Sequence, residues 1–360
     1  MDKIAKSYSG FFKTISKEKN TVHKLMYVCV SGSYSYGTNT SKSDVDIRGS
    51  FVANRNNYLG LQNIRQVEVP RADDKEKDTI YELRNFVRLA LANNPNVIEQ
   101  LFVNVEHQLY VAREFWPLIE NRQLFLSKKC KYTYSGYAYS QLKRIQGHYQ
   151  WISNPPKCPI KQDYIVKKYR NNVTGKFIPE GDYINKKIRA EKIVNSGKSI
   201  DKQLSSAVSP DKLDGMTTDH NFGNFNEWEL VDCFDEKNFK LDASNWEKYL
   251  TWKENRNEAR SKLEEKFYYD VKHASHLVRL LLQGKQILGE HKLDTHLKGE
   301  NLNFVRDVLE GKYSYPKLIE VVEALNNDLN VLYEKSELRS EPKTKEIEEI
   351  LVEILKKEVN

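Results

Sequence analysis

The sequence has few cysteines and no long apolar run. Its 360 residues include four cysteines, at positions 29, 130, 158 and 233, and no Cys-x-x-Cys spacing. This argues against a disulfide framework or a zinc site and predicts four reduced thiols. No apolar stretch approaches the ~20 residues that a membrane helix needs. The Lys-rich first 24 residues lack the apolar core of a signal peptide, so we expect a cytoplasmic protein without a membrane partner.

Two common loops that bind phosphate or calcium are also missing. A Walker loop needs Gly-x4-Gly-Lys followed by Ser or Thr, whereas Thr38 follows Gly37 directly and no lysine intervenes. An EF-hand needs oxygen ligands where Arg48 and Arg55 stand, so the aspartates at 44 and 46 do not begin a calcium loop. The remaining composition, with 39% hydrophobic and 30% charged residues, is ordinary for a globular chain of two or three domains.

A Gly-Ser pair follows the first strongly apolar run. Residues 25–30 predict a buried strand, because the run is short, rich in β-branched and aromatic side chains, and bounded by a Gly/Ser turn signal. Gly32 lets backbone N–H groups approach phosphate oxygens closely, and the Ser33 hydroxyl adds one more donor. We expect Gly32 and Ser33 to hold the β and γ phosphates of a nucleoside triphosphate.

Two aspartates one residue apart lie in the next predicted strand. Over residues 44–51 apolar residues alternate with Asp44, Asp46 and Arg48, which predicts a half-buried strand with these three side chains on one face. Paired carboxylates on a rigid strand suit Mg²⁺, or Mn²⁺, and can align an in-line attack on phosphorus. Arg48 can then neutralise charge on the triphosphate. The alternative is a hairpin whose aspartates are only solvated.

These motifs resemble the polymerase-beta nucleotidyltransferase superfamily, through Gly32-Ser33, Gly37-Thr38 and Ser43-Asp44-x-Asp46-Ile47. Four later motifs narrow the resemblance to the RNA-repair-pathway-linked (RNA-ligase-associated) nucleotidyltransferases: Tyr-Glu-Leu-Arg at 81–84, Asn-Pro-Asn-Val-Ile-Glu at 94–99, Tyr-Ala-x-x-Gln-Leu-Lys at 137–143 and Lys-His-Ala-x-His-Leu-x-Arg-Leu-Leu at 272–281. The resemblance covers residues 24–150 and 265–335. It implies nucleotidyl transfer and an α+β fold, in which a mixed sheet with helices is followed by an α-helical domain.

The resemblance also implies a third carboxylate on a neighbouring strand, acting as general base or completing the metal site. Asp78 and Glu82 are the candidates, because their equal parity on an extended segment points them the same way. Glu82 also precedes a helical pattern over residues 83–91, so stabilising the start of that helix is an alternative. Asn94-Pro95 stops this helix. For Glu99 we expect a structural pairing with a backbone group or an arginine.

A helical pattern runs from residue 253 to residue 288. Within it, Lys272, His276, Arg279 and Gln283 form a polar stripe beside an apolar one. A stripe that faces the cleft supplies cations to a nucleotide or acceptor phosphate, whereas one that faces water is only solvated. Because a family motif falls on these residues, we place Lys272, His276 and Arg279 at the nucleotide. His273 and His276 alone do not indicate a metal site, since no third ligand is nearby in the sequence.

Charge is strongly segregated along the chain. Residues 127–202 contain 17 Lys and Arg against five Asp and Glu, with aromatic residues interleaved, whereas residues 203–245 contain three against nine. Basic residues neutralise phosphates and aromatic rings stack on bases, so the first stretch predicts an RNA-binding surface, with a merely solvated face as the alternative. Turn signals within residues 210–224 predict an irregular acidic insertion that packs against the basic stretch. The RNA-binding candidates are Lys143, Arg144, Lys167, Lys168 and Arg170.

We therefore predict a catalytic domain over residues 1–125, a helical domain over 126–336 and a linker with an amphipathic helix over 337–360. Residues 150–250 match the family worst and form its divergent insertion. The expected reaction is Mg²⁺-dependent transfer of a nucleoside monophosphate from ATP or another NTP to an RNA 3′ end, such as that of tRNA. Two alternatives stay open, namely nucleotidylation of a protein side chain and RNA binding without catalysis.

Overall fold

The computed structural model describes residues 2–18, 21–61, 63–71, 77–195, 225–256 and 258–359. The chain divides into two compact units, one formed by residues 1–153 and 257–360 and the other by residues 154–256. The predicted division at residues 125 and 336 stays a prediction. The turn signals predicted within residues 210–224 lie outside the described residues.

The first unit contains a five-stranded mixed sheet with the strand order β3-β4-β2-β1-β5. Only β2 and β4 run parallel, and the other neighbouring strands are antiparallel. Together with its helices, this sheet confirms the predicted α+β class. The strands are β1 Val22–Ser31, β2 Asp46–Ala53, β3 Gln66–Pro70, β4 Lys77–Glu82 and β5 Gln108–Val111.

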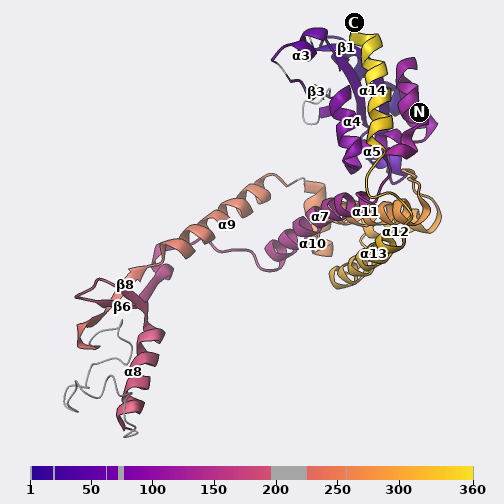
Figure 1. Cartoon of the computed structure of the whole chain (residues 1–360). Helices are drawn as coiled ribbons and strands as arrows, with labels where there is room; N and C mark the ends of the chain where they lie inside the picture. Colours follow the sequence, from indigo (N-terminus) through magenta and orange to yellow (C-terminus); the bar gives the residue numbers. More distant parts are fainter. Residues whose placement is uncertain are drawn as a thin grey trace. The chain divides into compact units, whose positions relative to one another are not determined.

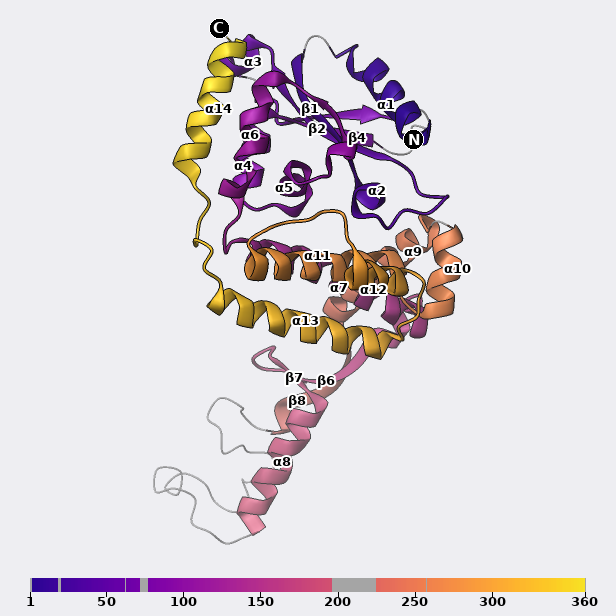
Figure 2. The same cartoon turned by 90° about the vertical axis from the view of Figure 1, so that its right-hand side faces the viewer.

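The helices of the first unit form two groups, which are visible in Figure 2. The group around the sheet comprises α1 Asp2–Ile15, α2 Gly32–Tyr36, α3 Arg55–Leu59, α4 Leu83–Leu91, α5 Pro95–Leu101, α6 Trp116–Glu120 and α14 Thr344–Val359. The second group packs around α11 and comprises α7 Cys130–Ser153, α10 Glu258–Phe267, α11 Val271–Glu290, α12 Gly299–Leu309 and α13 Tyr315–Lys335.

The predicted strand over residues 25–30 is confirmed as the buried centre of β1, in which Met26 to Val30 are fully inaccessible to solvent. The second predicted strand needs a correction. β2 begins at Asp46, so Asp44 precedes it, and from Gly49 onward both faces of β2 are buried. A Cβ at Gly49 would lie 2.1 Å from the Tyr27 carbonyl oxygen, because the neighbouring strand β1 packs closely there. β2 is therefore a central strand buried on both faces, and not a strand with one exposed face.

The predicted amphipathic helix near the C-terminus is α14, which packs against α4, α6 and β2 (Figure 1). Ile347 and Ile354 on its apolar face are buried. Lys24 on β1 joins this helix to the sheet layer, because its Nζ contacts Glu358 at 2.8 Å and Glu114 at 2.9 Å. The helix therefore docks on the body of the same chain.

The second unit contains a three-stranded antiparallel sheet with the strand order β7-β6-β8. Its small core centres on Tyr183 and Trp228, and the Tyr169 ring stacks on Tyr183 at 3.6 Å. β8 is regular, which corrects the predicted irregular acidic insertion over its residues, and its pairing with β6 confirms the contact with the basic stretch. The elements are β6 Ile165–Asn171, β7 Phe177–Pro179, α8 Glu180–Asn195, β8 Trp228–Phe234 and α9 Glu236–Glu254.

All four cysteines are free thiols. Within the described part of the chain, no helix combines the length and the apolarity needed to cross a bilayer.

Candidate active site

Strand register brings the Gly-Ser pair and two aspartates to one edge of the first unit's sheet. Ser31 at the end of β1 pairs with Asp46 at the start of β2. β4 runs parallel to β2 with Thr79 opposite Arg48, so Asp78 also lies at the start of β2. The Ile47 backbone N–H donates to Asp78 Oδ1 at 3.0 Å and fixes this carboxylate. Gly32 and Asp78, which lie 46 residues apart in the sequence, are thus neighbours in the fold.

Gly32 allows the closest approach in this cluster. Its φ is +65°, in the left-handed region, and a Cβ there would lie 2.0 Å from Asp46 Oδ2. A side chain at this position would meet both a backbone penalty and a direct clash with the carboxylate. Glycine therefore has two independent reasons to occupy position 32. Ser33, the next residue, is partly exposed and follows Gly32 into the short helix α2.

A single guanidinium joins the three aspartates. Arg71 Nη1 contacts Asp44 Oδ2 at 3.0 Å, and Arg71 Nη2 contacts Asp46 Oδ1 and Asp78 Oδ1 at 2.7 Å each. The Asp44 side chain is 50% exposed, that of Asp46 35% and that of Asp78 only 6%, so the cluster runs from solvent into the protein. Three carboxylates therefore converge on one positive charge at the edge of the sheet.

The electrostatics of this cluster favour a cation. Burial opposes the charge of Arg71, but the hydrogen bonds that Arg71 donates to Asp78 and Asp46 outweigh this effect and raise the Arg71 pKa. Burial also raises the pKa of Asp78, while the Arg71 guanidinium and the Ile47 N–H oppose that rise. Sequence reasoning missed Arg71. The available signal was that Arg71 directly follows β3. Because β3 and β4 are antiparallel, with Pro70 opposite Lys77, Arg71 lies near Asp78.

A cavity of about 460 Å³ adjoins this cluster. Ser33 and Asp44 lie in one wall, and Lys272, His276 and Arg279 of α11 lie in another. The polar stripe predicted on α11 therefore faces a cavity and not only solvent. The structure brings these five predicted residues around one space.

The charges along that wall differ from the prediction. Arg279 is buried, and its Nη1 contacts Glu99 Oε1 at 2.8 Å, while its guanidinium carbon lies 3.8 Å from the centre of the Tyr36 ring. Glu99 thus has the arginine partner that we expected, but it already balances the Arg279 charge. Burial, together with Arg279 and Lys272, lowers the pKa of His276 to about 3. Lys272 is exposed, so among these three residues it is the one whose charge is not buried. The placement of Lys272, His276 and Arg279 at a nucleotide stays a prediction.

Glu82 is not brought to the aspartate cluster. It is buried and accepts hydrogen bonds from the Arg84 and Asn85 backbone N–H groups, at 3.0 and 3.1 Å, as the N-cap of α4. The Tyr58 hydroxyl donates to it at 2.8 Å. Of the two candidates for the third carboxylate, the structure therefore places Asp78 beside Asp46. Arg48 is partly buried on β2 and is not among the described residues that line the cavity.

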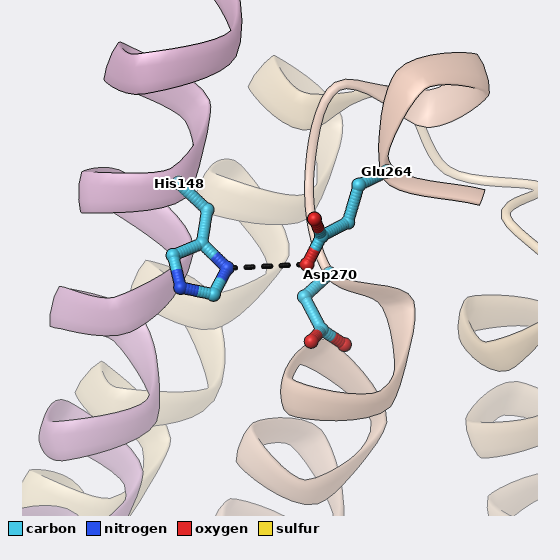
Figure 3. A group of neighbouring side chains, drawn as sticks. All are labelled: His148, Glu264 and Asp270. Atoms are coloured by element: carbon cyan, nitrogen blue, oxygen red, sulfur yellow. Dashed lines mark ion pairs between the residues drawn. The ribbon is translucent and has the colours of Figure 1, made fainter. Parts of the chain in front are cut away.

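A second group of possible metal ligands lies among the helices of the first unit (Figure 3). His148 of α7, Glu264 of α10 and Asp270 before α11 each offer a ligand atom, and these atoms lie within 4.8 Å of one another. His148 Nδ1 is 3.2 Å from Glu264 Oε1. Asp270 also caps α11 by accepting from the Lys272 and His273 N–H groups, at 2.8 and 3.0 Å. Imidazole and carboxylate ligands suit zinc, but an ion pair and a helix cap also account for this group.

The predicted RNA-binding residues fall in both units. Lys143 and Arg144 are exposed on α7, and Lys143 Nζ lies 4.9 Å from the centre of the Tyr139 ring. On β6 of the second unit, Lys167 is opposite Asp232 and Arg170 is opposite Glu229. Lys168 is instead opposite Val231 and Pro179. Acidic cross-strand neighbours thus offset two of the three β6 charges.

Comparisons with known proteins bear on the first half of the chain. Residues 5–169 match the profile described as RNA repair pathway DNA polymerase beta family, which confirms the resemblance drawn from the motifs within residues 24–150. The resemblance over residues 265–335 stays a prediction. A crystal structure of a nucleotidyltransferase-like protein from Exiguobacterium sibiricum 255-15 is 10% identical, with alignment over 96% of this chain and 79% of that chain and a TM-score of 0.25. A likeness at that TM-score carries no argument. No curated protein matches the chain.

Proposed function

Because residues 5–169 match the RNA repair pathway DNA polymerase beta family, we propose that this chain transfers a nucleoside monophosphate from an NTP to a hydroxyl at an RNA 3′ end. One observation carries the proposal. Asp44, Asp46 and Asp78 converge on a single cationic group beside Gly32 and Ser33, at the mouth of a cavity of about 460 Å³. Hard carboxylate oxygens at a phosphate-binding turn suit phosphoryl chemistry.

The residues of the cluster fit a divalent cation. All three side chains offer carboxylate oxygens, and Arg71 demonstrates that they stabilise positive charge at their common point. Asp44, Asp46 and Asp78 would hold Mg²⁺ or Mn²⁺, which when bound supplies charge neutralisation for the phosphates. The hydrogen bonds of Arg71 to these oxygens compete with that binding.

The remaining groups position the two reactants. Gly32 and Ser33 offer backbone and hydroxyl donors to the β and γ phosphates, and Lys272 offers a cation from the opposite wall of the cavity. The acceptor oxygen forms a bond to the α-phosphorus as the bond to the β-phosphate oxygen breaks. Pyrophosphate leaves, and Asp78, the most buried of the three carboxylates, would accept the acceptor's proton.

The test is label transfer from each of four labelled NTPs to total RNA and total protein, with Mg²⁺ or Mn²⁺. We expect labelled RNA, and we expect Asp44→Asn and Asp46→Asn to reduce transfer by about 100-fold or more without unfolding the protein. The matched control is Glu68→Gln, which changes an exposed carboxylate on β3. Transfer within tenfold of wild type in both Asp44→Asn and Asp46→Asn would contradict the assignment of these carboxylates to a metal site. Label in protein would favour protein nucleotidylation.

A further inference from the structure

A second cavity in the first unit lies along one face of α7. Its volume is about 610 Å³. Thr133, Tyr137 and Gln141 line it at four-residue spacing, which places them on one side of the helix. His276 and Arg279 line this cavity as well as the one beside the aspartates, so the same two side chains border both spaces.

The wall of this second cavity has the chemistry of a nucleotide site. Tyr137 offers an aromatic ring, and its hydroxyl accepts a hydrogen bond from Asn94 Nδ2 at 2.9 Å, which fixes the ring. Asn96 and Gln141 offer amide groups, and the exposed Arg144 offers a guanidinium at the rim. Among the described residues, no Asp or Glu lines the cavity. Rings stack on bases, amides read base edges and cations bind phosphate, while no carboxylate repels it.

Gly136 leaves part of the α7 wall open. Glycine inside a helix costs ~1 kcal/mol relative to alanine, yet Gly136 lies within α7, and a Cβ built on it would meet nothing within 4 Å. Gly147 on the same helix also has open space, but it does not line the cavity. The pair therefore separates the effect of filling the cavity from the effect of changing the helix.

We propose that this second cavity binds the terminal nucleotide of the RNA acceptor, next to the cavity for the NTP. The identity of this ligand as an acceptor rests on the proposed function. The arrangement accounts for two adjoining spaces, one with carboxylates and one without. It assigns a positioning role to Tyr137, Gln141 and Arg144 toward the acceptor and not toward the NTP.

The test compares Gly136→Leu with Gly147→Leu. The probe is a 5′-fluorescein single-stranded RNA of twelve nucleotides with a 3′-hydroxyl, and its binding is read by fluorescence anisotropy without NTP. Binding of the labelled NTPs is read separately by equilibrium dialysis. We expect Gly136→Leu to weaken RNA binding at least tenfold and to leave NTP binding within twofold, and Gly147→Leu to change neither. Leucine has a higher helix propensity than glycine, and Arg144→Gln, at an exposed position, is a second variant with the same expected direction.

Unchanged RNA binding in both Gly136→Leu and Arg144→Gln would overturn the inference. Loss of NTP binding with RNA binding retained would also overturn it, because the cavity would then hold the base of the NTP. The inference would also be overturned if the wild-type protein bound no RNA and, in the label-transfer test, only protein became labelled. If the wild type binds RNA in a Gly136-dependent manner but transfers no nucleotide, RNA binding in this cavity stands, whereas the proposed function and the identity of the RNA as an acceptor fail.

Discussion

At the residue scale, Gly32 couples backbone conformation to the position of a candidate catalytic carboxylate. We predict that Gly32→Ala abolishes nucleotide transfer, because the added Cβ would lie 2.0 Å from Asp46 Oδ2. Gly175→Ala is the matched control, since Gly175 has φ +68° with nothing within 4 Å. Gly175→Ala should lose ~1–2 kcal/mol in the free energy of unfolding, the cost of left-handed backbone for a residue with a Cβ. Gly32→Ala should lose more, because its Cβ also clashes with the Asp46 carboxylate. Equal transfer by the two variants would contradict the prediction.

Arg71 makes the second prediction at this scale. Removing its guanidinium leaves Asp46 and Asp78 without the cation that holds them together. We expect Arg71→Ala to lower the free energy of unfolding by ~1.5–3 kcal/mol without divalent ions, the range for hydrogen bonds to charged groups. Saturating Mg²⁺ should raise the free energy of unfolding of Arg71→Ala by more than it raises that of wild type. Urea unfolding with and without the ion measures both increases.

Lys77→Gln is the control for Arg71→Ala, because Lys77 is exposed and its partner is Glu68, away from the three aspartates. Its Mg²⁺ response should match that of wild type. An equal Mg²⁺-induced increase in the free energy of unfolding of Arg71→Ala and of wild type would show that the ion and the guanidinium do not bind the same carboxylates.

At the scale of elements, local pattern predicted β1, α4 and α14, but pairing between distant segments could not be predicted. The apolar run of β1 and the spacing of α14 are local signals. The role of Arg71 depends on the β3–β4 register, and the neutralisation of Arg279 depends on Glu99, 180 residues away. The predicted helix from residue 253 to 288 is also interrupted, because Tyr268 has φ +66° and Asp270 starts a new helix as the N-cap of α11. The candidate carboxylates were predictable, and their partners were not.

The pH dependence of stability should carry a contribution from α11. The pKa of His276 is lowered from 6.5 to about 3 by burial and by the neighbouring Arg279, Lys272 and His273. Between these two values the unfolded chain binds a proton that the folded chain does not, so stability falls as the pH falls through this window. At pH 5 the loss is at most ~2 kcal/mol.

Urea unfolding at pH 7 and pH 5 measures this contribution. His276→Gln should lose less stability on acidification than wild type does, whereas His23→Gln, at an exposed histidine of β1, should behave as wild type. Equal acid sensitivity in wild type and in His276→Gln would show that position 276 does not titrate on unfolding.

At the scale of the whole molecule, the net charge of +7 says less about RNA binding than does the pairing of basic with acidic residues on neighbouring strands. On β6, Lys168 has no acidic cross-strand neighbour, whereas Lys167 is opposite Asp232. We predict that Lys168→Gln reduces the slope of log RNA affinity against log salt by ~0.7 per lost phosphate contact. Lys167→Gln should reduce the slope less, and NTP binding should stay unchanged in both. Identical slopes in wild type and Lys168→Gln would remove β6 from the RNA-binding surface.

The docking of α14 has a consequence for the order of folding. Ile347 and Ile354 complete a core whose strands lie within the first 111 residues, so that core contains contacts between segments far apart in the chain. Contacts of such long sequence separation form late, because loop closure must precede them. We therefore expect the surface of α4, α6 and β2 that α14 contacts to stay uncovered during synthesis until residues 344–359 leave the ribosome.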